Sequence, residues 1–93
     1  MTVAVSVRIP TVLRGYTAGA RSVQAAGSDI RTLVDELERR HPGLRARLLD
    51  ETGALRRYVN IYVGEDDIRR GDGLATTLPQ GAVVSIIPAV AGG

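Results

Sequence analysis

The chain has 93 residues, with 12 basic and 10 acidic side chains, a formal net charge of +2 and no cysteine. The length predicts one small domain. A folded chain of this size buries only about 60–65% of the surface that its unfolded chain exposes, so its stability is expected to be modest. The lack of cysteine excludes a disulfide framework, a thiolate nucleophile and a thiolate metal site. The sequence shows no signal-like segment at its start and no long apolar run, so we expect a cytoplasmic protein with no membrane partner.

The first stretch of the chain predicts a β-hairpin. Residues 2–9 alternate between apolar and smaller or polar side chains, the period-two pattern of a half-buried strand, with the apolar set being Val3, Val5, Val7 and Ile9. Pro10 interrupts the ladder, and the segment 10–20 predicts the connection of the hairpin. A weaker strand is expected over 21–26, with Val23 and Ala25 on one face.

The next stretch predicts the main helix. Gly27-Ser28-Asp29 supplies its start, with Ser28 expected as the N-cap and Asp29 placed against the positive end of the helix dipole. Large apolar side chains then recur at helical spacing, at Ile30, Leu33, Val34 and Leu37. Burying each of them is worth about 1.5–3 kcal/mol, so this helix is expected to cover the sheet. The segment His41-Pro42-Gly43 ends it.

A short helical turn is expected over 44–49, and a turn-rich linker follows over 50–54. The clearest alternation of the second half lies over 57–63 and predicts a strand. Its core-facing residues are expected to be Val59, Ile61 and Val63, and its outward residues Tyr58, Asn60 and Tyr62. This strand therefore has one buried face and one free face.

The last third of the chain predicts two more strands. After the turn that follows residue 63, residues 68–69 can hold only a very short edge strand, and Leu74 and Leu78 can anchor a helical turn. Val83–Ile87 is rich in β-branched residues and predicts a buried strand, which Pro88 ends because it has no N–H to donate.

The order of these elements indicates the fold class. Strands gather at both ends of the chain with one amphipathic helix between them, which is typical of an α+β domain with a mixed sheet of about four to five strands and the helix on one face. The first and last strands are the most apolar, so we expect them side by side in the centre of the sheet. The domain is expected to span 1–88, with 89–93 as a flexible tail.

The tail carries the candidate site of chemistry. Five residues follow Pro88, and fully extended they reach about 17 Å beyond the sheet. Gly92 and Gly93 have no side chains, so the chain end can pass through a channel too narrow for a Cβ atom. The carboxylate of Gly93 is then the only reactive group on offer. The chain contains no lysine, so it has no ε-amine that could accept its own C-terminus.

A candidate partner-binding surface follows from the alternation of the last strand. If Val84 and Ile86 face the helix, the residues between them face outward beside the neighbouring strand, and the expected surface residues are Val83, Ile87, Tyr62 and Asn60. An apolar patch rimmed by polar groups is typical of a protein-binding surface. The alternative is that loops cover Val83 and Ile87 as part of the core.

Other chemistries find little support. The only histidine, His41, is expected to neutralise carbonyls at a helix end rather than to serve a nucleophile. The acidic residues Glu65, Asp66, Asp67 and Asp72 fit no EF-hand spacing, so we expect no metal site. The arginine pairs at 39–40, 56–57 and 69–70 have acidic residues interleaved and no tryptophan or phenylalanine platform, so we expect no nucleic-acid partner.

Four segments of the chain carry a resemblance to a known family, and they are Val7-Arg8-Ile9-Pro10-Thr11-Val12-Leu13-Arg14, Tyr58-Val59-Asn60-Ile61-Tyr62-Val63 with Glu65-Asp66-Asp67, Gly73-Leu74-Ala75-Thr76-Thr77-Leu78 and Ile87-Pro88-Ala89-Val90-Ala91-Gly92-Gly93. With them, and over nearly its whole length, the chain resembles the ThiS/MoaD-like group of small sulfur carriers with a ubiquitin-like β-grasp fold, and within it the CysO type. The single proline before Ala89 favours the CysO type.

The resemblance implies that the chain is a protein substrate rather than an enzyme. An E1-like enzyme of the MoeZ, MoeB or ThiF type would use Mg-ATP to adenylate Gly93, and a sulfur donor would convert it to a thiocarboxylate. Gly92, Ala91, Val90 and Ala89 would pass through the channel of the partner. The acceptor implied for the CysO type is a PLP-dependent cysteine synthase, so ATP and PLP belong to the partners and this chain binds no cofactor.

Two alternatives stay open. The first is a MoaD-like carrier that serves molybdopterin or a thiolated secondary metabolite. The second is a ubiquitin-like modifier whose Gly93 is joined to lysines of other proteins, since it would use the same tail and the same first step.

Overall fold

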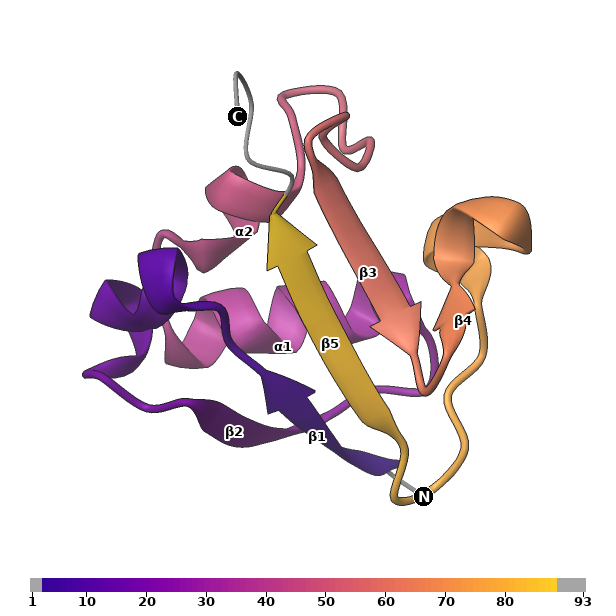
Figure 1. Cartoon of the computed structure of the whole chain (residues 1–93), viewed down its shortest axis with the longest axis horizontal. Helices are drawn as coiled ribbons and strands as arrows, with labels where there is room; N and C mark the ends of the chain where they lie inside the picture. Colours follow the sequence, from indigo (N-terminus) through magenta and orange to yellow (C-terminus); the bar gives the residue numbers. More distant parts are fainter. Residues whose placement is uncertain (1–2, 89–93) are drawn as a thin grey trace.

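Five strands form one mixed sheet in the order β2-β1-β5-β3-β4 (Figure 1). The computed structural model describes residues 3–88, and the strands and helices lie within them. The elements in chain order are β1 (Ala4–Arg8), β2 (Ser22–Ala26), α1 (Ile30–Arg40), α2 (Leu44–Leu48), β3 (Val59–Val63), β4 (Asp66–Asp67) and β5 (Val83–Pro88), with 3-10 helices at Thr11–Thr17, Ile68–Arg70 and Gly73–Ala75.

The two ends of the chain meet in the middle of this sheet. Strand β5 pairs in parallel with β1 on one side and antiparallel with β3 on the other, while β1 and β2 form an antiparallel hairpin. The prediction that the first and last strands lie side by side in the centre is therefore confirmed. A mixed five-stranded sheet of this order packed on one main helix is the β-grasp, or ubiquitin-like, fold.

The core lies between α1 and one face of the sheet. Figure 1 shows α1 behind the strands, and its four predicted apolar residues, Ile30, Leu33, Val34 and Leu37, are each only 1% exposed. They pack in one cluster with the alternating inward residues of β1, β3 and β5, which are Val5, Val7, Val59, Ile61, Val84 and Ile86. Since each buried side chain of this size stabilises the fold by about 1.5–3 kcal/mol, the helix and the sheet hold one another in place.

The prediction for the N-cap of the main helix was wrong by one residue. Asp29, not Ser28, is the N-cap of α1, and its carboxylate accepts a hydrogen bond from the N–H of Thr32 at 2.8 Å. The reason is a tertiary contact, because the N–H of Ile30 donates to the carbonyl of Thr76 at 3.1 Å and that of Leu78 to the carbonyl of Ser28 at 2.9 Å. This short bridge keeps the chain extended through Asp29.

The prediction of a very short edge strand at 68–69 was also wrong, by two residues. Strand β4 consists of Asp66–Asp67, and the following residues, Ile68–Arg70, form a 3-10 helix. A two-residue turn at Gly64 and Glu65 brings Asp66 opposite Val63, and it is tight because Gly64 takes a left-handed φ of 62°. Ile68 then leaves the strand direction and enters the core, where it is 2% exposed.

Smaller differences occur at the hairpin. Strand β1 covers Ala4–Arg8 rather than the whole of 2–9. The connection between β1 and β2 contains a 3-10 helix that buries Leu13 and Thr17, so it is more ordered than a plain loop. Within 3–88, no helix is long and apolar enough to cross a membrane.

Candidate functional site

The candidate site lies where the central strand leaves the sheet. Pro88 is the last residue of β5, opposite Val59 of β3. The predicted tail residues Ala89, Val90, Ala91, Gly92 and Gly93 lie outside the described residues. The structure therefore describes the strand to which the tail is attached, up to Pro88.

The outward face of β5 carries the predicted apolar patch. Val84 and Ile86 are 1% and 4% exposed, whereas Val83 and Ile87 are 43% and 47% exposed. The alternative in which loops cover Val83 and Ile87 is thus excluded. Two apolar side chains stand free on the face of the sheet that α1 does not cover, which we call the open face.

The open face also brings together the other predicted partner-binding residues. Asn60 lies opposite Ile87, and Tyr62 lies opposite Ser85, in the antiparallel register of β3 and β5. Ser85 in turn lies beside Arg8 of β1. A row of side chains therefore crosses the open face from β1 to β3, and the four predicted residues are neighbours on it. Their role in binding stays a prediction.

Asn60 has a partner within the chain that the sequence did not predict. Its Oδ1 accepts a hydrogen bond from Nη1 of Arg69 at 2.7 Å, and the same nitrogen donates to the carbonyl of Val59 at 2.6 Å. The second terminal nitrogen of this guanidinium group, Nη2, donates to the carbonyl of Arg56. One arginine thus ties the loop before β3 to the start of that strand, directly opposite the end of β5.

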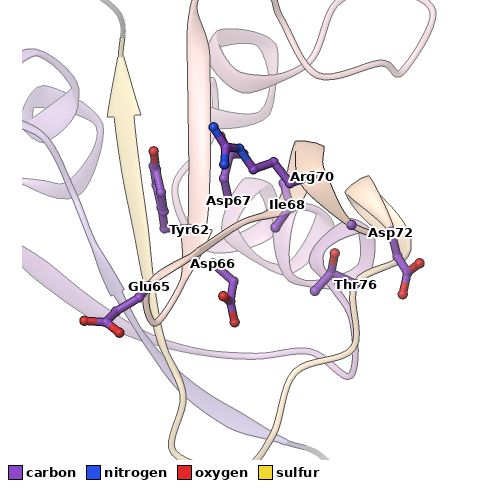
Figure 2. Close-up of a pocket in the computed structure, with 9 residues that line it drawn as sticks. Tyr62, Glu65, Asp66, Asp67, Ile68, Arg70, Asp72 and Thr76 are labelled. Carbon is purple, nitrogen blue, oxygen red and sulfur yellow. The ribbon is translucent and has the colours of Figure 1, made fainter.

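A hollow of about 630 Å³ lies at the other end of the sheet, around the turn between β3 and β4. It is lined by the acidic residues singled out in the sequence, Glu65, Asp66, Asp67 and Asp72, together with Tyr62 and Arg70. Figure 2 shows the carboxylates of Glu65, Asp66 and Asp72 turned away from one another. Across 3–88 no group of three or more histidine, aspartate or glutamate side chains is placed to hold one metal ion.

The carboxylates with a perturbed pKa serve the fold rather than a reaction. The N–H groups of Gly43 and Arg45 donate to Glu38 at 3.0–3.1 Å and lower its pKa. Hydrogen bonds from Arg39 and Arg40 lower the pKa of Glu36 in the same way. Backbone or hydroxyl donors likewise lower the pKa of two further carboxyl groups, Asp29 and Asp50. Each of these groups is held ionised, so none is poised as a general acid.

His41 lies at the end of α1, as the sequence predicted. It is the C-cap residue, and its backbone N–H donates to the carbonyl of Leu37 at 2.7 Å. The position at the helix end is confirmed, and the role of the imidazole stays a prediction.

The family model for the ThiS family matches residues 7–93, which include the end of β1, the whole of the other four strands and the tail. The chain belongs to the ThiS family. It is 46% identical over 91 residues to the sulfur carrier protein CysO of Mycobacterium tuberculosis, covering 96% of this chain and 98% of the relative. It is also 35% identical over 78 residues to small archaeal modifier protein 3 of Haloferax volcanii, covering 81% of this chain and 84% of the relative.

Solved structures of ThiS-like proteins agree with this assignment. The fold matches a chain of the Amycolatopsis orientalis BexX/CysO complex with a TM-score of 0.90 and 44% identity, over 96% of this chain and 99% of that one. It matches the CysO crystal structure of Mycobacterium tuberculosis with a TM-score of 0.88 and 44% identity, over 92% and 99% of the two chains. The family assignment and the β-grasp fold are thus supported independently.

The first part of the chain has a charge pattern that also bears on the site. The first acidic residue of this ThiS-family chain is Asp29, and before it stand three arginines, Arg8, Arg14 and Arg21. In the structure these three line a single groove beside Ile87 and Pro88. Their spacing along the chain is irregular, and only the hairpin brings them together.

Proposed function

We propose that this protein is a sulfur carrier whose C-terminal carboxylate is activated and converted to a thiocarboxylate. The observation that carries the proposal is that the central strand β5 leads directly into the Gly92-Gly93 ending, in a chain 46% identical to the carrier CysO. On this proposal the chain is the substrate of two partner enzymes and performs no catalysis itself.

The activation step needs an enzyme of the E1-like type and Mg-ATP. A carboxylate oxygen of Gly93 attacks the α-phosphorus of ATP, and pyrophosphate leaves. The carboxylate is a poor electrophile because it is anionic, whereas the mixed anhydride with AMP has a good leaving group. The role of this chain is to present Gly93 on a narrow arm, since a residue with a side chain at Gly92 would be stopped by a tight channel.

The sulfur step follows on the same carbon. A hydrosulfide ion attacks the acyl carbon of Gly93. With hydrosulfide, the C–S bond forms, the C–O bond to AMP breaks, and AMP and one proton leave. The product is a terminal thiocarboxylate, which is a nucleophile at neutral pH. By its likeness to CysO we propose that its acceptor is a PLP-dependent cysteine synthase, and PLP supplies the electrophile in that enzyme.

The open face is proposed as the surface that both enzymes contact. Val83 and Ile87 are exposed apolar residues on the strand that carries the tail, with Tyr62 beside them and Asn60 held in place by Arg69. A tail of five residues has a reach of about 17 Å, so an enzyme that acts on Gly93 must approach the end of β5 closely. This requirement favours contact with Ile87, which directly precedes Pro88 at that end of the strand.

The decisive experiment is the intact mass of the protein after incubation with a MoeZ-like activating enzyme, Mg-ATP and a sulfur source. We expect a gain equal to the replacement of one oxygen by sulfur, and the product should take up one further alkyl group from an alkylating reagent, whereas the unconverted carboxylate should not. The matched control is a Gly92→Val variant, which keeps the carboxylate but should not pass the channel. An unchanged mass of the wild-type protein, beside a carrier that the same enzyme does convert, would refute the proposal.

A second candidate is a protein modifier, favoured by the likeness to small archaeal modifier protein 3. It shares the adenylation step but ends in an isopeptide bond between Gly93 and a lysine of another protein. Affinity-tagged chain recovered from its host distinguishes the two, because adducts larger than the chain indicate modification and a free thiocarboxylate indicates carriage.

A further inference from the structure

A basic groove lies between the β1–β2 hairpin and the end of β5. Its volume is about 670 Å³, and its lining includes Arg8, Arg14 and Arg21 on one side and Ile87 and Pro88 on the other, with no acidic residue among the described lining. The groove therefore adjoins both the apolar patch of the open face and the point where the tail leaves the sheet.

A buried isoleucine organises the three arginines. Ile9 is 2% exposed, and Arg8 precedes it at the end of β1. The N–H of Ile9 donates to the carbonyl of Arg21 at 2.8 Å, and its carbonyl accepts a hydrogen bond from Nε of Arg14 at 3.1 Å. Because Ile9 is fixed in the core, the three cationic residues are held around one point.

These arginines do not contribute to the ion pairs of the fold. Within residues 3–88, the ion pairs join Arg39 and Arg40 to Glu36 and Arg45 to Asp35, all on or beside α1. The described lining holds these three like charges and no acidic residue, so the charges repel one another slightly and their clustering does not itself stabilise the fold. Such a cluster fits an anionic partner.

The sheet is also polarised along β5. The acidic hollow surrounds the turn after Val63, which lies opposite Val84 near the start of β5, while the basic groove adjoins Pro88 at its end. A charge separation of this kind orients an approaching partner, because complementary potentials steer encounters and raise association rates. The cationic end is the end that carries the tail.

We propose that the basic groove docks an acidic segment of the activating enzyme and so directs the tail toward its site. This inference rests on the proposed function, and charge complementarity argues for the occupant. Planar guanidinium groups bind carboxylates in a bidentate manner. The short tail also confines any enzyme that reaches Gly93 to the neighbourhood of the groove.

The test compares two double variants of equal net charge. Arg8→Gln with Arg21→Gln removes two exposed groove cations and spares Arg14, which has a structural hydrogen bond. The control, Arg31→Gln with Arg70→Gln, removes two exposed cations from α1 and from the acidic hollow. Pyrophosphate release by a MoeZ-like enzyme is measured against carrier concentration between about 0.02 and 0.3 M sodium chloride, and binding without nucleotide is measured by calorimetry.

We expect the groove variant to lower kcat/KM about tenfold at low salt, to leave kcat nearly unchanged and to flatten the salt dependence, as rim charges act mainly on association. Its melting temperature should match that of the wild type. The control should keep at least half of the wild-type kcat/KM.

Equal losses in the two double variants would show that net charge alone matters and would overturn the groove proposal, as would unchanged binding of the groove variant. Groove-dependent binding of a fluorescent single-stranded oligonucleotide, with unaltered binding of the enzyme, would assign the groove to nucleic acid instead. A wild-type chain that binds the enzyme through the groove but releases no pyrophosphate would refute the proposed function and leave the docking site standing.

Discussion

Replacing Arg69 by methionine tests how the exit of the tail is held. The guanidinium group of Arg69 donates to the carbonyls of Val59 and Arg56 and to Oδ1 of Asn60. Strand β4 pairs only with the last two residues of β3, Tyr62 and Val63, so the carbonyl of Val59 lies beyond its end. Arg69 supplies a donor there that a longer edge strand would otherwise provide.

The expected cost follows from these contacts. Charge-assisted hydrogen bonds are stronger than neutral ones, but Arg69 is an exposed residue, and water can replace part of each bond. We therefore expect the Arg69→Met variant to lose about 1–2 kcal/mol of unfolding free energy in total. For a domain of this size, that loss lowers Tm by about 5–15 °C. Arg69→Lys should lose nearly as much, because one ammonium cannot span three acceptors.

The matched control is Arg70→Met, which removes the same charge one residue later. The side chain of Arg70 is exposed and has no hydrogen bond or ion pair within the part of the chain that the structure describes, so we expect a change within about 0.5 kcal/mol. Urea unfolding followed by far-UV circular dichroism measures both variants under the same conditions. Equal stabilities of the Arg69→Met and Arg70→Met variants would show that Arg69 does not clamp the loop.

Three further variants test the fold and the open face. Gly27→Ala should lose about 1–3 kcal/mol, because its Cβ would lie 2.8 Å from backbone atoms of α1, while Gly15→Ala, where nothing lies within 4 Å, should change little in the same urea titration. Glu38→Gln should lower Tm at pH 7, because the lowered pKa of Glu38 means that its ionised form stabilises the fold. This stabilisation is complete above the pKa of Glu38 in the unfolded chain and is lost as pH falls through its pKa in the folded chain. A Tm difference between the variant and the wild type that persists well below about pH 4 would contradict this explanation. Ile87→Asp should fold with a Tm within a few degrees of wild type, because the side chain is 47% exposed, yet lower kcat/KM for adenylation at least tenfold; joint loss of folding and adenylation would return Ile87 to the core.

The sequence predicted the elements whose side chains repeat. The helical spacing of Ile30, Leu33, Val34 and Leu37 and the alternation of β1, β3 and β5 all correspond to buried faces in the structure. Burial of these apolar faces is the largest favourable term in folding, and it requires apolar residues at a regular spacing that can be recognised in the sequence. The α+β class and the central pairing of the chain ends followed from the same pattern.

The errors arose where contacts between distant segments decide local structure. Ser28 and Asp29 are both good N-cap residues, and the choice between them depends on hydrogen bonds to Thr76 and Leu78, far along the chain. The position of β4 likewise depends on a tight glycine turn and on the burial of Ile68. Neither contact has a periodic signature in the sequence.

The same distinction applies to the candidate site. Alternation along β5 was enough to place Val83 and Ile87 on the open face, because parity within a strand is a local property. The clamp of Arg69 on Asn60 and the gathering of Arg8, Arg14 and Arg21 around Ile9 join residues from different elements. Polar contacts of this kind become visible only when the fold is known.

The central position of β5 has a mechanical consequence for a carrier. An edge strand can separate from its single neighbour, whereas β5 pairs with both β1 and β3 at Val84 and Ser85 and with β3 alone from Ile86 to Pro88. Opening such a strand approaches global unfolding in free energy, while local opening of an edge costs much less. On the proposed function, a partner enzyme that binds the tail would therefore meet a strand held on both sides up to Ser85 and by β3 up to Pro88, and its binding energy would go into placing Gly93 rather than into opening the sheet.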